Sequence, residues 1–249
     1  MKEGLPLYWS TIVISFFLAF VHIIAGRLHF LDTIPRSRFL SAAGGISVAY
    51  VFVHVLPELG EHQQVVNENI RFLDFLEHHV YIVALLGLMV FYAIEKYVKV
   101  SRKKSREQTG EENLEMEVFW VHVLLFFFYN ALIGYLLAYR AGEGFNSLIL
   151  YAVTMSLHFL IIDYGLRYHH EDTYDKYGRW TLAFAVIVGA VAGNFALIPE
   201  SIFAVVFAFL SGAIILNVLK EELPEERDSN LGTFAAGAGG YILLLLFIT

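Results

Sequence analysis

Cysteine is absent from this chain of 249 residues, so neither disulfide bonds nor thiolate metal sites contribute to it. Charged residues are also scarce, at 16% of the chain, whereas a soluble domain of this length carries about a quarter. The net charge is −7 and the few basic residues cluster between apolar stretches, which argues against nucleic acid as a partner. What the chain has instead is 57% hydrophobic residues, a composition typical of a protein that lies in a lipid bilayer.

Eight apolar runs each have about the 20 residues that a helix needs to cross a ~30 Å hydrocarbon layer. We place these runs at residues 7–27, 38–58, 78–98, 118–139, 146–167, 180–198, 200–219 and 231–249. The sequence therefore predicts an all-α, polytopic, integral membrane protein with one transmembrane domain over residues 1–249. We expect it in a cell or plasma membrane, with the first run as an uncleaved spanning helix.

Loop charge predicts the orientation of these helices. The first and third loops are basic and the second is acidic, and cationic loops stay in the cytoplasm. Both termini are then extracytoplasmic. Residues 99–117 form the longest polar stretch, which we expect to be a flexible cytoplasmic linker.

The second apolar run, 38–58, contains Gly44 and Gly45 and ends in His54, Pro57 and Glu58. His54 and Glu58 are four residues apart, so they share one face of a helix, and this spacing can hold a divalent cation. We expect Pro57 to stop the helix, because it lacks a backbone N–H and disfavours the α conformation of the residue before it.

This ending resembles one helix of the ZIP (Zrt/Irt-like) metal transporter family. The third run before a long polar loop, the small residues 189–193 in the sixth run and the acidic end of the seventh at 219–226 are similar to that family as well. The resemblance implies a ZIP-like bundle of eight transmembrane helices that transports divalent metal cations.

In ZIP transporters the metal pathway lies between the fourth and fifth helices, which carry polar segments of the type His-Asn-x-Pro-Glu-Gly and His-Glu-x-Pro-His-Glu. Here the fourth helix keeps Asn130 and Gly134, and the fifth keeps His158. The remaining ligand and proline positions hold Tyr, Leu, Ile and Phe. Asp163 is acidic, but it lies roughly 140° around the helix from His158. The usual two-metal site therefore cannot be assembled. The resemblance accordingly implies a divergent member of the ZIP family.

Ionisable residues inside a spanning helix are costly and indicate a function by default. The candidate metal ligands are Asn130, His158, Asp163, His122, His54 and Glu58. If the helices pack as the resemblance implies, the first four could line one interior path, which His22 could join from the first helix. Structural alternatives stay open: His22 and His122 as hydrogen-bonded core residues, and Asp163 in an ion pair with Arg167.

Three functions follow from these patterns. The first is a ZIP-like transporter in which Zn²⁺ or another divalent cation is the substrate and no cofactor is tightly bound; zinc suits the nitrogen-rich ligands best. The second is a transport-inactive ZIP-like scaffold or sensor, favoured by the missing prolines and carboxylates. The third, an intramembrane zinc hydrolase, lacks a His-x-x-x-His helix, so we do not expect an enzyme. Small-residue faces would allow a homodimer.

Overall fold

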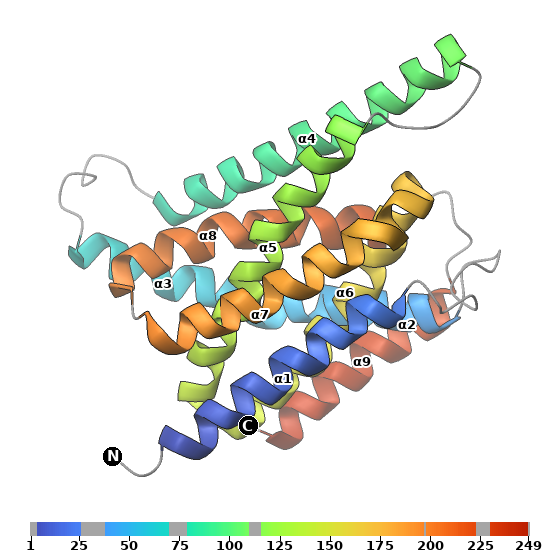
Figure 1. Ribbon diagram of the computed structural model, residues 1–249. Coiled ribbons are helices and arrows are strands. Elements are labelled where there is room, and N and C mark those ends of the chain that lie inside the picture. Colours follow the sequence, from blue (N-terminus) through green and yellow to red (C-terminus); the bar gives the residue numbers. More distant parts are fainter. Residues whose placement is uncertain are drawn as a thin grey trace. The chain divides into compact units, whose positions relative to one another are not determined.

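The computed structural model describes residues 4–25, 38–69, 79–109, 116–196, 198–222 and 230–248, which form helices and short connections without a strand. Its helices are α1 Gly4–Ala25, α2 Arg38–Tyr50, η2 Val51–Val55, α3 Leu56–Asn69, α4 His79–Thr109, α5 Met116–Glu143, α6 Phe145–Thr173, η4 Tyr174–Gly178, α7 Arg179–Phe195, α8 Glu200–Asn217, η5 Val218–Glu222 and α9 Leu231–Ile248 (Figure 1). The all-α prediction is confirmed for this part. Of the predicted loops, 28–37 and the parts 70–77 and 223–229 lie outside the described residues. The loop expected from residue 59 is corrected, because residues 59–69 continue helix α3.

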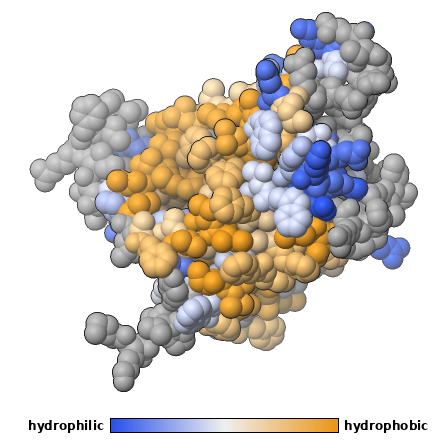
Figure 2. All heavy atoms as spheres, viewed as in Figure 1, coloured by the Kyte–Doolittle hydropathy of each residue, from blue (hydrophilic) through white to orange (hydrophobic). Residues whose placement is uncertain are grey.

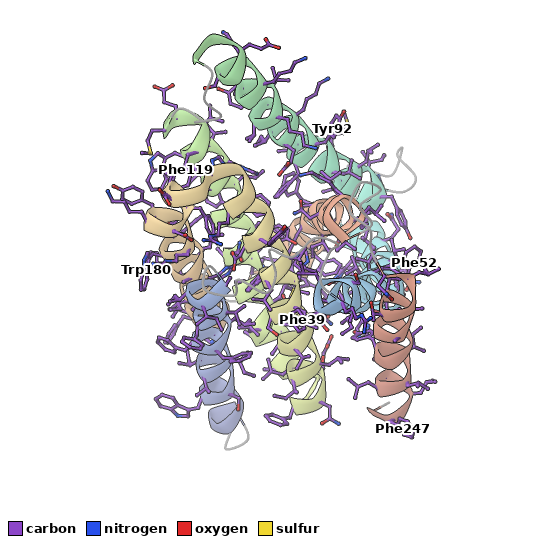
Figure 3. All side chains as sticks on the ribbon, turned by 90° about the vertical axis from the view of Figure 1, so that its right-hand side faces the viewer. Phe39, Phe52, Tyr92, Phe119, Trp180 and Phe247 are labelled. Carbon is purple, nitrogen blue, oxygen red and sulfur yellow. The ribbon has the colours of Figure 1, made fainter. Side chains whose placement is uncertain are left out.

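Six helical segments are long and apolar enough to cross a membrane. They are Arg38–Val65, His79–Ser105, Met116–Glu143, Phe145–Arg167, Tyr174–Phe195 and Glu200–Lys220. Two shorter apolar helices are Trp9–Ala25 and Leu231–Phe247. Hydrophobic side chains cover most of the described surface in Figure 2, and large aromatic residues such as Trp180 and Phe247 are exposed (Figure 3). These are the features of a multi-pass membrane protein.

The helices divide into two compact units. The first contains α1, α5, α6, α7, η4 and the part of α4 from Ile94 onward. A hydrogen bond from Asn194 to Thr11 (2.9 Å) joins α7 to α1, and the Tyr151 hydroxyl on α6 donates to the Ile133 carbonyl on α5 (3.0 Å). The turn between α5 and α6 is a single residue, Gly144, whose φ of 123° favours glycine. Four helices are thereby held around one polar interior.

Close packing of α5 against α7 depends on glycine. A Cβ atom at Gly134 would overlap the Val186 carbonyl oxygen, and one at Gly189 would overlap the Ala131 carbonyl oxygen. The two backbones touch without intervening side chains, as is common between membrane helices because lipid supplies no hydrophobic driving force for their association. Small residues in this part of the chain therefore allow α5 and α7 to pack closely.

The second unit contains α2, η2, α3, α8, η5, α9 and the first half of α4. Glycines again mark the helix contacts: Gly45 lies against the backbone of Phe234 on α9, and Gly212 lies against that of Ala84 on α4. Between α3 and α8, the His62 ring contacts the ring of Phe207 edge-on, with centroids 4.8 Å apart.

The prediction that Pro57 stops a helix is wrong. The backbone stays helical from α2 through η2 into α3, with Leu56 at φ −68° and ψ −44°. The π-helical turn at Val51–Val55 explains why: the Leu56 N–H bonds to the Val51 carbonyl five residues back, so the hydrogen-bond ladder is shifted where the proline ring would otherwise clash. Pro57 therefore accompanies a widened turn in a continuous helix.

The flexible linker expected from residue 99 is also corrected. Helix α4 continues to Thr109, so residues 99–109 are helical, and residues 110–115 lie outside the described part. Lys, Arg, Glu and Gln dominate this extension, and their straight side chains favour a helix.

Candidate functional site

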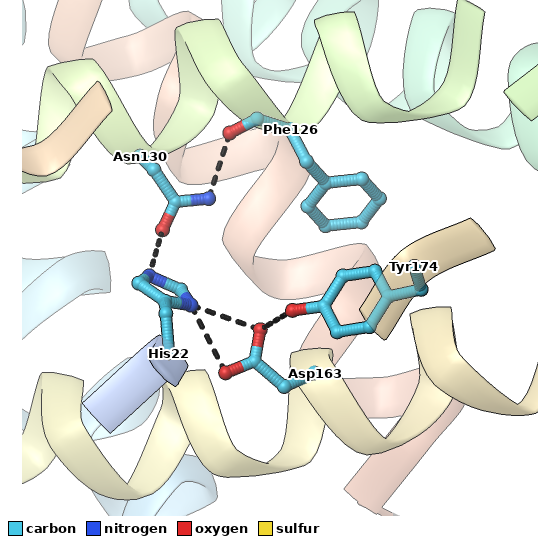
Figure 4. Close-up of polar contacts among 5 residues, drawn as sticks. All are labelled: His22, Phe126, Asn130, Asp163 and Tyr174. Carbon is cyan, nitrogen blue, oxygen red and sulfur yellow. Dashed lines mark hydrogen bonds and ion pairs between the residues drawn. The ribbon is translucent and has the colours of Figure 1, made fainter. Parts of the chain in front are cut away.

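Three polar side chains from three helices meet inside the first unit. His22 on α1 and Asn130 on α5 have no solvent-exposed area, and Asp163 on α6 is 1% exposed (Figure 4). The apolar flanks of each helix, such as Leu18 beside His22 and Ile162 beside Asp163, bury this face against its neighbours. A carboxylate in such surroundings requires partners, because isolated burial of its charge is very costly.

His22 links the other two residues. Its Nδ1 atom lies 2.9 Å from Oδ1 and 3.0 Å from Oδ2 of Asp163, and its Nε2 atom lies 3.0 Å from Oδ1 of Asn130. The Asn130 amide nitrogen donates to the Phe126 carbonyl at 2.7 Å, which fixes Oδ1 toward His22. The Nε2 atom of His22 therefore carries a hydrogen and donates it to Asn130.

A single proton is then shared between His22 and Asp163. It resides on Nδ1, giving an imidazolium beside a carboxylate, or on Asp163, giving two neutral groups. The pair has no net charge in either arrangement, which lowers the cost of burying it in a membrane interior. The ring of His22 also stacks on Phe159, with centroids 4.3 Å apart, so its orientation is fixed by packing as well.

Tyr174 completes this cluster, and the sequence analysis missed it. Its hydroxyl donates to Oδ1 of Asp163, and the tyrosine is fully buried at the start of the π-helical turn η4. Gly178, one turn on, leaves room for the tyrosine ring, which a Cβ there would overlap. One signal was present: Asp163 and Tyr174 are 11 residues apart, close to three helical turns, and so share a helix face.

His158 has a different neighbour. Its Nε2 atom and the hydroxyl of Tyr129 on α5 share a hydrogen bond of 2.6 Å, and both side chains are 1% exposed. Tyr129 stands at the position where the resemblance expects the first metal ligand. In this chain the residue at that position forms a hydrogen bond with His158 on α6.

His122 belongs to a second buried chain of side chains within the same unit. Its Nε2 atom lies 2.9 Å from Oε1 of Glu95 on α4, and its Nδ1 atom lies 2.9 Å from Nε2 of His170 on α6. Donation from His122 to Glu95 and from His170 to His122 satisfies both contacts. His122 thus lies between Glu95 and His170, and not in the cluster around His22.

His54 and Glu58 lie in the second unit. The Nδ1 atom of His54 is 3.2 Å from the hydroxyl of Tyr241 on α9, and Glu58 Oε1 is 4.0 Å from Nε2 of His62, one turn further along α3. The two residues therefore have different neighbours, Tyr241 for His54 and His62 for Glu58.

The alternative pairing of Asp163 with Arg167 is wrong. Arg167 Nε donates to Oδ2 of Asp175 at 3.1 Å, and each of these side chains is 30% exposed. Asp163 instead faces the interior, toward α1. The four-residue spacing of Asp163 and Arg167 would allow an ion pair within α6. Pairing of Asp163 with His22 also gives the buried His22 a hydrogen-bond partner.

Among the described residues, no group of three or more His, Asp or Glu side chains is arranged to hold a metal ion. The buried polar side chains around His22, His122 and His158 are instead paired with one another. Comparison of the chain with protein-family models, with curated proteins and with solved structures finds no match.

Proposed function

We propose that this chain is a ZIP-like membrane transporter of divalent metal cations, with zinc as the preferred substrate and a divergent intramembrane site. It crosses the membrane with eight helices, and both termini are outside the cytoplasm, as the loop charges predict. Asp163 carries the proposal: it is a carboxylate buried beside an imidazole and an amide, on three helices of one unit. Groups of this kind inside spanning helices mark ion pathways.

The chemistry of a cation at this position follows from the shared proton. A divalent ion between Nδ1 of His22 and the Asp163 carboxylate would replace that proton, with an imidazole nitrogen and a carboxylate oxygen as ligands. The Oδ1 atom of Asn130, on the far side of the His22 ring, would hold the ring in orientation by accepting from Nε2. Zinc suits this mixture of nitrogen and oxygen ligands.

A transport-inactive membrane scaffold or sensor is the second candidate, and one observation favours it. His22, Asp163, Asn130 and Tyr174 satisfy one another, and α5 and α6 run through the unit without a proline break. An interior of this kind is stable without a cation.

Metal flux separates the two candidates. Purified protein in liposomes that enclose a zinc-sensitive dye is exposed to external Zn²⁺, and the Asp163→Asn variant is compared with Asp172→Asn. Asp172 is an exposed carboxylate on the same helix, so its loss should leave flux unchanged. Zinc entry that is abolished in Asp163→Asn and retained in Asp172→Asn supports transport; no entry with the wild-type protein contradicts it.

A further inference from the structure

The outward face of α4 changes character along the helix. Tyr81, Leu85, Met89 and Tyr92 are each about half exposed, and at spacings of four, four and three residues they form one stripe. Lys96, Lys99 and Lys103 continue this stripe at spacings of four, three and four, and all three are exposed. A single helix face therefore passes from apolar through aromatic to basic.

The length of α4 fits this change. Its 31 residues extend about 46 Å at 1.5 Å per residue, which exceeds a ~30 Å hydrocarbon layer. The layer takes up about 20 of these residues, so the last third of α4, from about Lys99 onward, reaches the headgroup region and continues beyond it. Tyr92 and Tyr97, 55% and 51% exposed, are of the type that lies at a membrane interface (Figure 3 labels Tyr92).

Acidic side chains on this part of α4 neutralise little of the lysine charge. Glu95 is buried and contacts His122, so its carboxylate faces the interior of the unit. The Nζ atom of Lys103 lies 3.9 Å from Oε1 of Glu107, and these side chains are 80% and 66% exposed. Because an ion pair this exposed to solvent is weak, it neutralises little of the lysine charge. The three lysines thus present positive charge outward.

From this continuity and charge we propose that Lys96, Lys99 and Lys103 form a binding surface for the headgroups of anionic phospholipids. The apolar stripe, from Tyr81 to Tyr92, precedes the lysines along α4 and faces the acyl chains. The lysine side chains extend to the phosphates at the membrane surface. The inference does not depend on metal transport.

Native mass spectrometry of the purified full chain in a neutral detergent tests this by counting bound lipids. Each lysine near a charged surface contributes roughly fivefold in affinity, so we expect at least a tenfold preference for phosphatidylglycerol over phosphatidylcholine. The triple variant Lys96→Gln, Lys99→Gln, Lys103→Gln should bind the two lipids within about threefold of each other. The matched triple Lys→Arg variant keeps the charge and should keep the preference.

Two further measurements define the ligand. Raising NaCl should weaken the preference, because exposed charges are screened. Soluble glycerol 3-phosphate carries the anionic group without acyl chains and should not displace the lipid. The proposal is overturned if the wild-type chain shows no preference, if the Gln variant retains it, if the Arg variant loses it, or if glycerol 3-phosphate competes effectively.

Discussion

His22 and Asp163 are 141 residues apart in the sequence, and Nδ1 of His22 lies 2.9 Å from Oδ1 of Asp163 in the buried interior of one helical unit. Neither side chain could be buried at moderate cost without the other. Their pairing joins α1 to α6 and, through Asn130, to α5.

Removal of both members of this pair should cost less than the sum of the two single removals. We expect His22→Phe and Asp163→Leu each to lower the free energy of unfolding in detergent by about 3–5 kcal/mol, because each leaves a buried polar group without its principal partner. The double variant should be more stable than the sum of the single effects predicts, by more than about 1 kcal/mol. Denaturant unfolding measures this cycle, and strictly additive losses would show that the two residues do not interact.

Tyr129 should restrain His158. In Tyr129→Phe the 2.6 Å hydrogen bond is lost, at a cost of about 1–2 kcal/mol in the free energy of unfolding. If His158 is a zinc ligand, the same variant should bind zinc more tightly, because zinc binding to Nε2 then no longer breaks the hydrogen bond with Tyr129. Tyr177→Phe, at an exposed position, is the control for both measurements. Unchanged zinc affinity in Tyr129→Phe would remove His158 from the ligand set.

Two glycines of α5 provide a matched test of helix packing. Alanine at Gly134 would place a methyl group on the Val186 carbonyl oxygen and force α5 and α7 apart, so we expect a loss of about 1–3 kcal/mol. A Cβ atom at Gly142 would meet no other atom within 4 Å. Replacement of Gly142 by alanine should therefore be neutral or stabilising by up to about 1 kcal/mol. Equal effects of the two variants on the melting temperature would contradict this packing.

Pro57 should be nearly neutral despite its place within a helix. In a regular α-helix proline costs about 3 kcal/mol, but the π-helical turn before Pro57 already removes the clash. Pro57→Ala should therefore change the free energy of unfolding by less than about 1 kcal/mol. A gain near 3 kcal/mol would show instead that the proline strains the helix.

The positions of the helices could be predicted because each depends on one local property, a run of about 20 apolar residues. Predicted run 146–167 and helix α6, for example, begin within one residue of each other. The partners inside the first unit could not be predicted in the same way. His122 and Asn130 are eight residues apart on α5, and this suggested a shared path, yet His122 contacts Glu95 and His170 while Asn130 contacts His22. Rotation and depth of neighbouring helices decide such contacts, and apolar periodicity carries little of that information.

The most direct test of the account is zinc entry into liposomes that contain the wild-type protein, compared with protein-free liposomes. Transport predicts a saturable, protein-dependent signal from the enclosed dye, lost in Asp163→Asn and retained in Asp172→Asn. Zinc entry at the rate of protein-free liposomes, with a folded protein in the membrane, would contradict the transporter and leave the scaffold or sensor.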